Sequence, residues 1–348
     1  MCRKYICLAL LWGISAGAAE FLPDLSRESQ PAYAGDDVIE GNNYGRVVER
    51  EYAGMVRVLS GDVLRENGYL TLGEALAEQA GVYVEYLPGA EGPIMVPRVR
   101  GAAAGAVLVL IDDVPVNDLG GGWSELRAVP LENVRRVEVF ASPVGGRHGD
   151  GAYGGVIRVY TNEGPWERAK TLLSASDGSF DSERYRFAFD VTTHGWDVSC
   201  SGNRRLSLEP NTRNASNRNA AANVDAAVRY RGTGWDVRVA AAHYAGFDAV
   251  LEPFTWDEVI NSASRDAPAR KNYRQDRVAV DTRWDTGPAL IRARGYYRAG
   301  GGAFENYETR RSYQYRGREA ASTLAYERPH GDGVFVTGLT FGGRENSD

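Results

Sequence analysis

Residues 145–161 read GGRHGDGAYGGVIRVYT, and this stretch joins a glycine-rich segment directly to a strand-forming run. Six of its first eleven residues are glycine, a residue favoured where φ must be positive or where another backbone lies close. A phosphate-binding loop of the Walker type would end in Gly-Lys-Ser/Thr and lead into a helix. Residues 156–161 are instead mostly β-branched and aromatic, so we expect a strand there and no nucleotide site.

The N-terminus indicates an exported protein. A short basic start is followed by apolar residues at 5–14 and small residues at 15–19, the pattern of a secretory signal peptide over 1–19. No later segment has the run of about 18 apolar residues that a membrane-spanning helix needs. An exported chain of this kind is either soluble or enters a membrane as strands. Cys200 is the one cysteine left after cleavage, so we expect no intrachain disulfide.

The composition argues against several functional classes. The 348 residues carry a formal net charge of −6, which gives no indication of a nucleic-acid partner. The four histidines are scattered, and no pair has helical metal-ligand spacing. No Gly-x-Ser-x-Gly stands at a strand-to-helix turn and no histidine is placed to act as a base, so we expect no enzyme.

A polar extension at 20–53 precedes a segment at 54–163 that reads as a compact α/β domain. Ser60 can cap a short helical turn, and Thr71 begins a second helix in which Glu74 completes a capping box and Gly81 ends the helix. The apolar and alternating runs of this segment predict strands at 55–59, 82–86, 107–111, 137–140 and 156–160.

Residues 164–348 have a different sequence pattern, in which polar and apolar residues alternate. The clearest runs are 184–191, 224–231, 235–240, 278–284 and 291–298. A soluble β-sandwich also alternates, but here the polar face is rich in Arg and Asp, which suits a water-filled lumen. Short connections such as 231–234 alternate with long ones such as 245–275, as in outer-membrane barrels. Aromatic residues expected at strand ends are typical of interfacial girdles, namely Trp196, Trp235, Trp284, Tyr296 and Tyr297.

Several motifs of residues 36–161 occur in the order of the plug domain of TonB-dependent outer-membrane receptors. They are TLGEAL at 71–76, RVRG at 98–101, the strand at 107–116, VPLENVRRVEV at 129–139 and the opening stretch. The chain resembles this family closely in the plug motifs. In the barrel region it resembles the family in the alternation of polar and apolar residues. The resemblance implies an α+β plug domain followed by an antiparallel transmembrane β-barrel. It also implies that the glycines let backbones pass closely where the plug is wedged inside the barrel wall.

Three departures from the family pattern stand out. Asp112-Asp113 replaces the usual Asp-Gly turn, and Asp tolerates the left-handed region at some cost. Ala141-Ser142-Pro143 and His148 replace the usual Arg/Lys-Gly-Pro and Tyr. The residues after 165 suffice for about nine or ten strands, where the family closes about 22, and 342–348 is polar and turn-like. We therefore expect an incomplete barrel from a fragment or a truncated reading frame, because bare sheet edges are not tolerated in lipid.

The resemblance implies active import of a scarce, bulky nutrient across the outer membrane, energised by TonB of the inner membrane. The chain looks similar to cobalamin transporters and to ferric-siderophore receptors. Because the stretch before the plug is short, we expect a plain transporter without the signalling domain of transducing members. The candidate TonB box, which could equally be a chance cluster in a linker, consists of Asp37, Val38, Ile39 and Glu40.

Ligand contacts are expected in two plug loops, 86–95 and 117–123, although each could equally be an ordinary solvated turn. The candidate residues are Tyr86, Glu91, Met95, Asn117, Asp118 and Trp123. Arg98 and Arg100 are candidates for pairing with barrel carboxylates, or could be plain surface charges. One acidic loop could hold calcium or simply be solvated, and it contains Asp248, Glu252, Asp257 and Glu258. We expect no other cofactor.

Two alternatives to a transporter are an outer-membrane adhesin or porin-like protein and a degenerate receptor fragment. An adhesin or porin-like barrel would not need the ordered plug motifs at 71–161, so these motifs favour the receptor.

Overall fold

The computed structural model describes residues 38–40, 46–48, 56–69, 71–79, 81–87, 94–129, 131–141, 151–161, 164–179, 182–208, 218–250, 269–306, 310–330 and 333–347. The expected signal peptide at 1–19 lies outside these residues, as do Asp37, Glu91, His148 and most of the acidic loop with Glu252, Asp257 and Glu258. The side chains of Tyr86 and Asp248 are likewise not described.

The plug is built around a five-stranded sheet with the strand order β3-β8-β9-β6-β7. Its strands are β3 (Val56–Ser60), β6 (Val107–Ile111), β7 (Val114–Pro115), β8 (Val134–Phe140) and β9 (Gly155–Thr161). The β6–β9 pair is parallel and the other pairs are antiparallel. Two further hairpins stand apart from this sheet, one of β1 (Val38–Glu40) with β2 (Arg46–Val48) and one of β4 (Val82–Leu87) with β5 (Ile94–Val99). The five strands predicted in this segment are therefore all present.

Two short helices pack on the plug sheet, and both begin where the capping residues predict. In α1 (Gly61–Glu66) the backbone N–H of Val63 donates to the Ser60 hydroxyl at 3.2 Å. In α2 (Leu72–Ala77) the N–H of Glu74 donates to the Thr71 hydroxyl at 3.3 Å. The second helix ends at Ala77, before the predicted end at Gly81. Two 3₁₀ turns complete the plug, η2 (Ala104–Ala106) and η3 (Leu126–Ala128).

The plug sheet has a hydrophobic core on each face because its central strands are apolar throughout. In β6, Val107, Val109 and Ile111 pack into one cluster with α1 and α2, while Leu108 and Leu110 pack into the other. The neighbouring strand β9 follows the same pattern, except that Arg158 replaces an apolar residue on the second face. That exception places a charge inside the domain and begins the site described below.

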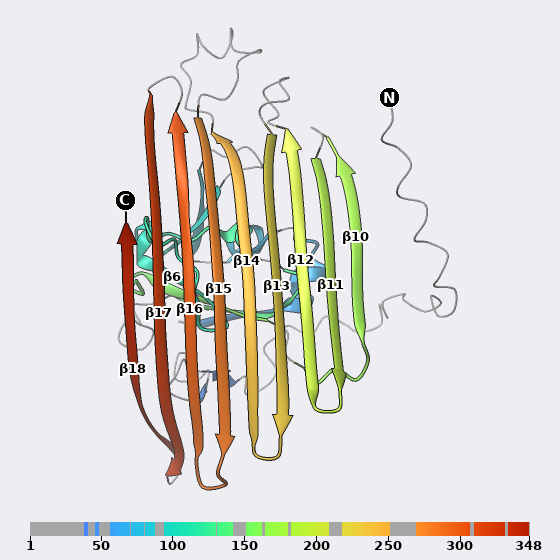
Figure 1. The fold of residues 1–348 in the computed structure, drawn as a ribbon, viewed down its shortest axis with the longest axis vertical. Coiled ribbons are helices and arrows are strands. Elements are labelled where there is room, and N and C mark those ends of the chain that lie inside the picture. Colours follow the sequence, from blue (N-terminus) through green and yellow to red (C-terminus); the bar gives the residue numbers. More distant parts are fainter. Residues whose placement is uncertain are drawn as a thin grey trace, which may run out of the picture. The chain divides into compact units, whose positions relative to one another are not determined.

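Residues from 170 onward form a nine-stranded antiparallel meander (Figure 1). Its strands are β10 (Lys170–Gly178), β11 (Ser182–Thr193), β12 (Trp196–Leu208), β13 (Arg218–Gly232), β14 (Trp235–Val250), β15 (Ala269–Asp285), β16 (Leu290–Asn306), β17 (Arg311–His330) and β18 (Gly333–Ser347). Tight connections such as 194–195 and 233–234 lie at one end of the strands, here called the turn end. The opposite end of the strands, where β12 ends at Leu208 and β14 at Val250, is here called the loop end.

Strand register separates the side chains of this sheet into two faces. In β14 and β15, for example, Arg238 is paired with Asp281, and both are buried, whereas the neighbouring pair Val239 and Val280 is exposed. We call the face that carries Arg238 the inner face, because its side chains contact the plug, and the other the outer face. The charged face predicted to line a lumen is thus the face that meets the plug.

The expected aromatic girdle is confirmed for three tryptophans and wrong for two tyrosines. Trp196, Trp235 and Trp284 lie at the turn end on the outer face, each between 41 and 46% exposed. Tyr296 lies within β16 rather than at its end, and its hydroxyl donates to Glu319 on the inner face at 2.6 Å. Tyr297 is exposed but is also mid-strand.

Two further expectations are corrected. Residues 342–347, interpreted as turn-like, belong to β18 and pair with β17 from Ala321 to Arg316. The long connection expected at 245–275 is shorter, because β14 continues to Val250 and β15 begins at Ala269. The fold class is confirmed, an α+β plug followed by an antiparallel barrel-type sheet. Over the described residues this sheet is open, with β10 and β18 at its two edges.

Candidate functional site

The plug presents an acidic turn, Asp112-Asp113, to the inner face of the sheet. This turn joins β6 to β7, and both residues have positive φ, 48° and 64°. Two successive residues of positive φ are characteristic of a type I′ hairpin turn, in which Gly is common at the second position. The Asp112 carboxylate accepts hydrogen bonds from the Thr161 N–H at 2.9 Å and the Thr161 hydroxyl at 2.7 Å. The turn is thereby fixed to the end of β9.

Each carboxylate of the turn pairs with an arginine of the large sheet. Arg238 of β14 donates to Asp112 at 2.8 Å and to the Thr161 hydroxyl at 2.9 Å. Arg294 of β16 pairs with Asp113 and also with Asp281 of β15. The side chains of Arg238 and Asp112 are 5% and 12% exposed, so this pair lies largely out of water. An Asp at position 113, where the family has Gly, therefore supplies a second carboxylate for the sheet.

A second layer of charge lies behind the turn, inside the plug. Arg158 pairs with Asp113 and lies 3.6 Å from Glu138, and both Arg158 and Glu138 side chains are at most 2% exposed. Arg136 pairs with Glu138 at 2.9 Å, and the Tyr160 hydroxyl donates to the Glu138 carboxylate at 3.2 Å. The guanidinium groups of Arg158 and Arg136 also lie 4.9 and 4.4 Å from the Tyr160 ring centre. The plug–sheet ion pairs thus continue into the plug core.

Burial and charge act in opposite directions on these carboxyl groups. Burial raises the pKa of Asp112, but the charge of Arg238 and the hydrogen bonds from Thr161 outweigh it, so that the pKa is lowered. The same balance, with Arg158 and Arg294 as the cations, holds the pKa of Asp113 below its ordinary value. At Glu138 the effect of burial is larger than that of the neighbouring cations, so its pKa is raised despite Arg158 and Arg136. The two turn residues are therefore the anions that hold the plug to the sheet at neutral pH.

Polar contacts continue along the inner face on both sides of the turn. The Asn133 amide donates to Asp225 of β13 at 2.8 Å, and the same carboxylate accepts from Ser201 at 2.7 Å. Arg205 of β12 donates to the carbonyl of Arg127 at 2.8 Å. These contacts extend the interface from β16 to β12.

Near the loop end of the sheet, the plug segment 117–123 meets aromatic side chains of the strands. The Tyr315 hydroxyl donates to the Asp118 carboxylate, which also accepts the N–H groups of two plug glycines. The Lys271 ammonium lies 4.1 Å from the centre of the Trp123 ring. The hydroxyls of Tyr244 and Tyr273 are 2.6 Å apart. These groups line a small cavity of about 50 Å³ between plug and sheet.

The other predicted site residues lie elsewhere. Met95 is a core residue, not a loop residue, and its sulfur accepts from the Thr71 hydroxyl at 3.3 Å. Asn117 is buried, and its side chain bonds the backbone of Val107, Val109 and Gly122. These two residues make structural contacts, whereas Asp118 and Trp123 lie at the cavity, and the expected ligand role of all four stays a prediction.

The arginines predicted to contact the barrel do not make the contacts described above. Arg98 pairs with Glu85 at 2.6 Å across the β4–β5 hairpin, and both side chains are about 30% exposed. Arg100 is exposed and has a φ of 51°. The plug contributes mainly carboxylates to the interface and the sheet contributes arginines, the reverse of the expected polarity. The alternation of polar and apolar residues in 235–240 and 291–298, which places Arg238 and Arg294 on one face, is the sequence signal that could have indicated this.

The glycines of the opening stretch permit close approach inside the plug rather than against the barrel wall. At Gly155, whose φ is +150°, a Cβ would lie 2.6 Å from the Phe140 carbonyl oxygen. At Gly154 it would overlap the Cβ of Ala102. Of residues 145–150 nothing structural is described, so the expectation for them stays a prediction.

Two features are absent from the residues that the structure describes. None of their His, Cys, Asp and Glu side chains gather in threes to form a metal site. In those residues no helix combines the length and apolar character needed to cross a membrane.

A small α+β domain held by ion pairs on the charged face of a long antiparallel meander defines a class of membrane protein, the plugged barrel. The TonB-dependent receptor plug domain family matches residues 48–156. The chain thus carries the plug domain of a TonB-dependent receptor followed by part of the barrel sheet, as the motifs predict. Receptors with this domain are outer-membrane proteins.

Solved structures with the same fold include receptors for iron chelates and a copper transporter, OprC. A variant of the ferric enterobactin receptor PfeA from Pseudomonas aeruginosa has a TM-score of 0.67 at 15% identity, over 86% of this chain and 50% of its own. The siderophore receptor PirA from Acinetobacter baumannii has a TM-score of 0.67 at 15% identity, over 89% and 50%. The ferric yersiniabactin uptake receptor FyuA from Yersinia pestis has 0.68 at 16%, over 84% and 48%. The chain therefore spans about half the length of these structures.

Proposed function

We propose that this chain is the plug and the first barrel strands of a TonB-dependent transporter that imports a ferric siderophore. The observation that carries the proposal is the cavity beside segment 117–123, at the loop end of the sheet. There a plug tryptophan, a lysine and three tyrosines converge from the plug and from β14, β15 and β17. Siderophore receptors share the fold, which favours an iron chelate over cobalamin.

The chemistry of the cavity suits an anionic, aromatic chelate. Lys271 and Arg277 contribute positive charge, and Trp123 and Tyr273 offer ring faces on which aromatic groups can stack. Its present volume of about 50 Å³ is far too small for such a ligand, since ligand pockets hold roughly 300–1,000 Å³. The chelate would stack on these rings once segment 117–123 shifts from its present contacts with Tyr315 and Lys271, which enlarges the cavity.

Ligand binding is tested with ferric enterobactin and the full chain purified in mild detergent. Replacing Trp123 by Ala should weaken binding about tenfold, because stacking on an aromatic ring contributes on the order of 1–1.5 kcal/mol. Trp166, in the segment before β10, provides the matched control, so Trp166→Ala should bind like the wild type. Equal affinity of the Trp123 variant and the wild type would remove the cavity from the proposal.

Energy coupling is proposed to run through residues 37–40, of which Val38–Glu40 forms a strand paired with β2. TonB would bind by strand addition, which depends on backbone N–H groups. Ile39→Pro removes one such donor and should abolish iron uptake from ferric enterobactin in cells while leaving chelate binding unchanged. Retention of TonB-dependent uptake by this variant would contradict the assignment of the box. No enzymatic reaction is proposed.

A further inference from the structure

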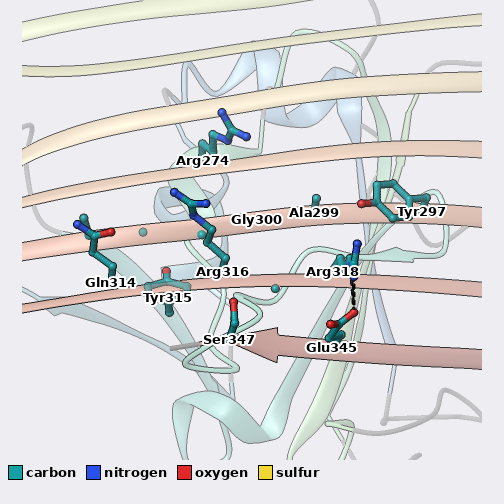
Figure 2. Close-up of a pocket in the computed structure, with 14 residues that line it drawn as sticks. Arg274, Tyr297, Ala299, Gly300, Gln314, Tyr315, Arg316, Arg318, Glu345 and Ser347 are labelled. Carbon is teal, nitrogen blue, oxygen red and sulfur yellow. Dashed lines mark hydrogen bonds and ion pairs between the residues drawn. The ribbon is translucent and has the colours of Figure 1, made fainter.

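A groove of about 640 Å³ lies on the sheet near its loop end, across β15 to β18 (Figure 2). Gly300, Gly301 and Ala299 of β16 line it, so little side chain fills its floor. Figure 2 shows Arg316, Arg318 and Glu345 around this glycine-lined stretch, with Arg274 on the neighbouring strand. One residue of its lining, Tyr315, also contacts the plug, because its hydroxyl donates to Asp118.

Strand register places the arginines of this groove on the outer face. Arg274 is paired with Gly301, and Gly301 with Arg316, so the three lie in one row across β15, β16 and β17. Gln275, which follows Arg274, donates to the Val116 carbonyl of the plug at 3.2 Å. Successive side chains of a strand point to opposite faces, so Arg274 points away from the plug.

The outer face changes character along the strands. Towards the turn end from the groove it carries exposed apolar side chains, among them Leu324, Leu339 and Phe341, which are 53, 63 and 71% exposed. Trp284 follows at the turn end. The arginines therefore stand at the loop-end border of an apolar band, where the headgroups of a membrane lie if this sheet is part of a barrel wall.

The charge of the groove is complementary to an anion. Its lining contains three arginines and one carboxylate, Glu345, which pairs with Arg318 at 2.7 Å. The Arg274 side chain is 72% exposed and lies 3.7 Å from Asp276. The guanidinium group binds phosphate through two parallel N–H donors, which makes arginine the preferred residue for such groups.

We propose that this outer groove binds the phosphate-bearing headgroup of an outer-leaflet lipid, with Arg274 and Arg316 as the phosphate ligands. The inference rests on the outer-membrane placement in the proposed function, but on a different face from the chelate cavity. The lipid chains would lie on the apolar residues towards the turn end, and Glu345 would orient Arg318 at the rim.

The test uses native mass spectrometry of the full chain, delipidated in mild detergent and titrated with dioleoyl phosphatidic acid. The wild type should retain this lipid at least about tenfold better than phosphatidylcholine, because the phosphate monoester is exposed and doubly charged. The double variant Arg274→Ala, Arg316→Ala should lose that preference. The conservative variant Arg274→Lys, Arg316→Lys should retain part of it, since lysine keeps the charge but not the planar fork.

Arg204 gives a matched control, because it is exposed on the outer face of β12, in the row that continues through Ala222 and Ala245 to Arg274. Arg204→Ala should bind phosphatidic acid like the wild type. Equal binding by the double variant and the wild type, or no preference in the wild type, would overturn the proposal. So would displacement of the lipid by inorganic phosphate at equal concentration, which would indicate a free-anion site.

Binding of ferric enterobactin is measured on the same samples, so that the two proposals fail separately. The single variant Arg316→Ala should bind the chelate like the wild type, because Arg316 does not line the cavity and its side chain lies on the outer face. A wild type that prefers phosphatidic acid but does not bind the chelate would count against the transporter proposal alone. A wild type that binds the chelate but shows no lipid preference would count against the groove alone.

Discussion

The two faces of the nine-stranded sheet carry arginines in very different surroundings. On the inner face, Arg238 is 5% exposed and bonded to Asp112 of the plug. On the outer face, Arg274 is 72% exposed and lies 3.7 Å from a carboxylate. Both residues belong to alternating strands and cannot be told apart by the pattern itself. What distinguishes them is the plug, which excludes water from one face and supplies its anions.

The largest expected effect lies where the inner ion pairs enter the plug core. Arg158→Met should lower the free energy of unfolding of the plug by about 3–5 kcal/mol, because it leaves Asp113 and Glu138 buried without their shared cation. Arg98→Met, which breaks the half-exposed pair with Glu85, should cost at most about 1 kcal/mol. Urea unfolding of the full chain, followed by tryptophan fluorescence, measures both. Similar costs for the two variants would show that Arg158 is not effectively buried.

A smaller effect is expected at the turn, where strain and charge oppose each other. Asp113→Gly relieves a positive φ, worth about 1 kcal/mol, but removes the anion that faces Arg158 and Arg294. Asp113→Asn keeps a residue that tolerates this backbone and removes only the charge. We expect both variants to be less stable than the wild type by about 2–3 kcal/mol, with Asn the less stable of the two. A stabilised Gly variant would mean that strain outweighs the ion pairs.

Lowering the pH should reduce the stability that the ion pairs of the inner face contribute, over a defined pH range. The pKa values of Asp112 and Asp113 are lowered in the folded protein. Their contribution to stability is therefore complete above their unfolded pKa of about 4 and is lost as the pH falls through the lower folded values. The stability difference between the wild type and the double variant Asp112→Asn, Asp113→Asn should be constant from pH 5 to 7 and shrink below about pH 4. A difference that instead grows on acidification would reverse this assignment.

The smallest effect is expected on the outer face. Arg274→Ala should change the unfolding free energy by no more than about 0.5 kcal/mol, because the side chain is largely exposed. Circular dichroism during urea unfolding measures it. A loss comparable to that of the Asp113 variants would erase the contrast between the two faces.

Much of this arrangement was predictable from the sequence, for physical reasons that can be named. Ser60 and Thr71 cap helices through local hydrogen bonds, so their roles follow from neighbouring residues alone. The alternation in 235–240 and 291–298 fixes which residues share a face. The partner of each charge does not follow, since Asp113 and Arg294 are 181 residues apart.

The errors have similar causes. The loop expected at 86–95 includes Met95, but Met95 lies in β5 and packs against Gly73 of α2. Residues 342–347 look like a turn by their glycines, yet β17 provides a full set of strand partners. Arg98 has a carboxylate partner within its own hairpin, which the RVRG motif does not reveal. In each case a tertiary neighbour, rather than local propensity, decided the outcome.

The central claim, that the plug is held on the inner face by its acidic turn, is tested most directly by a double-mutant cycle on Asp113 and Arg294. Unfolding free energies are measured for the wild type, Asp113→Ala, Arg294→Ala and the double variant of the full chain. The ion pair predicts a coupling energy of about 2 kcal/mol or more. Additivity of the two single substitutions within about 0.5 kcal/mol would show that the two residues do not interact, and would contradict this account of how plug and sheet are joined.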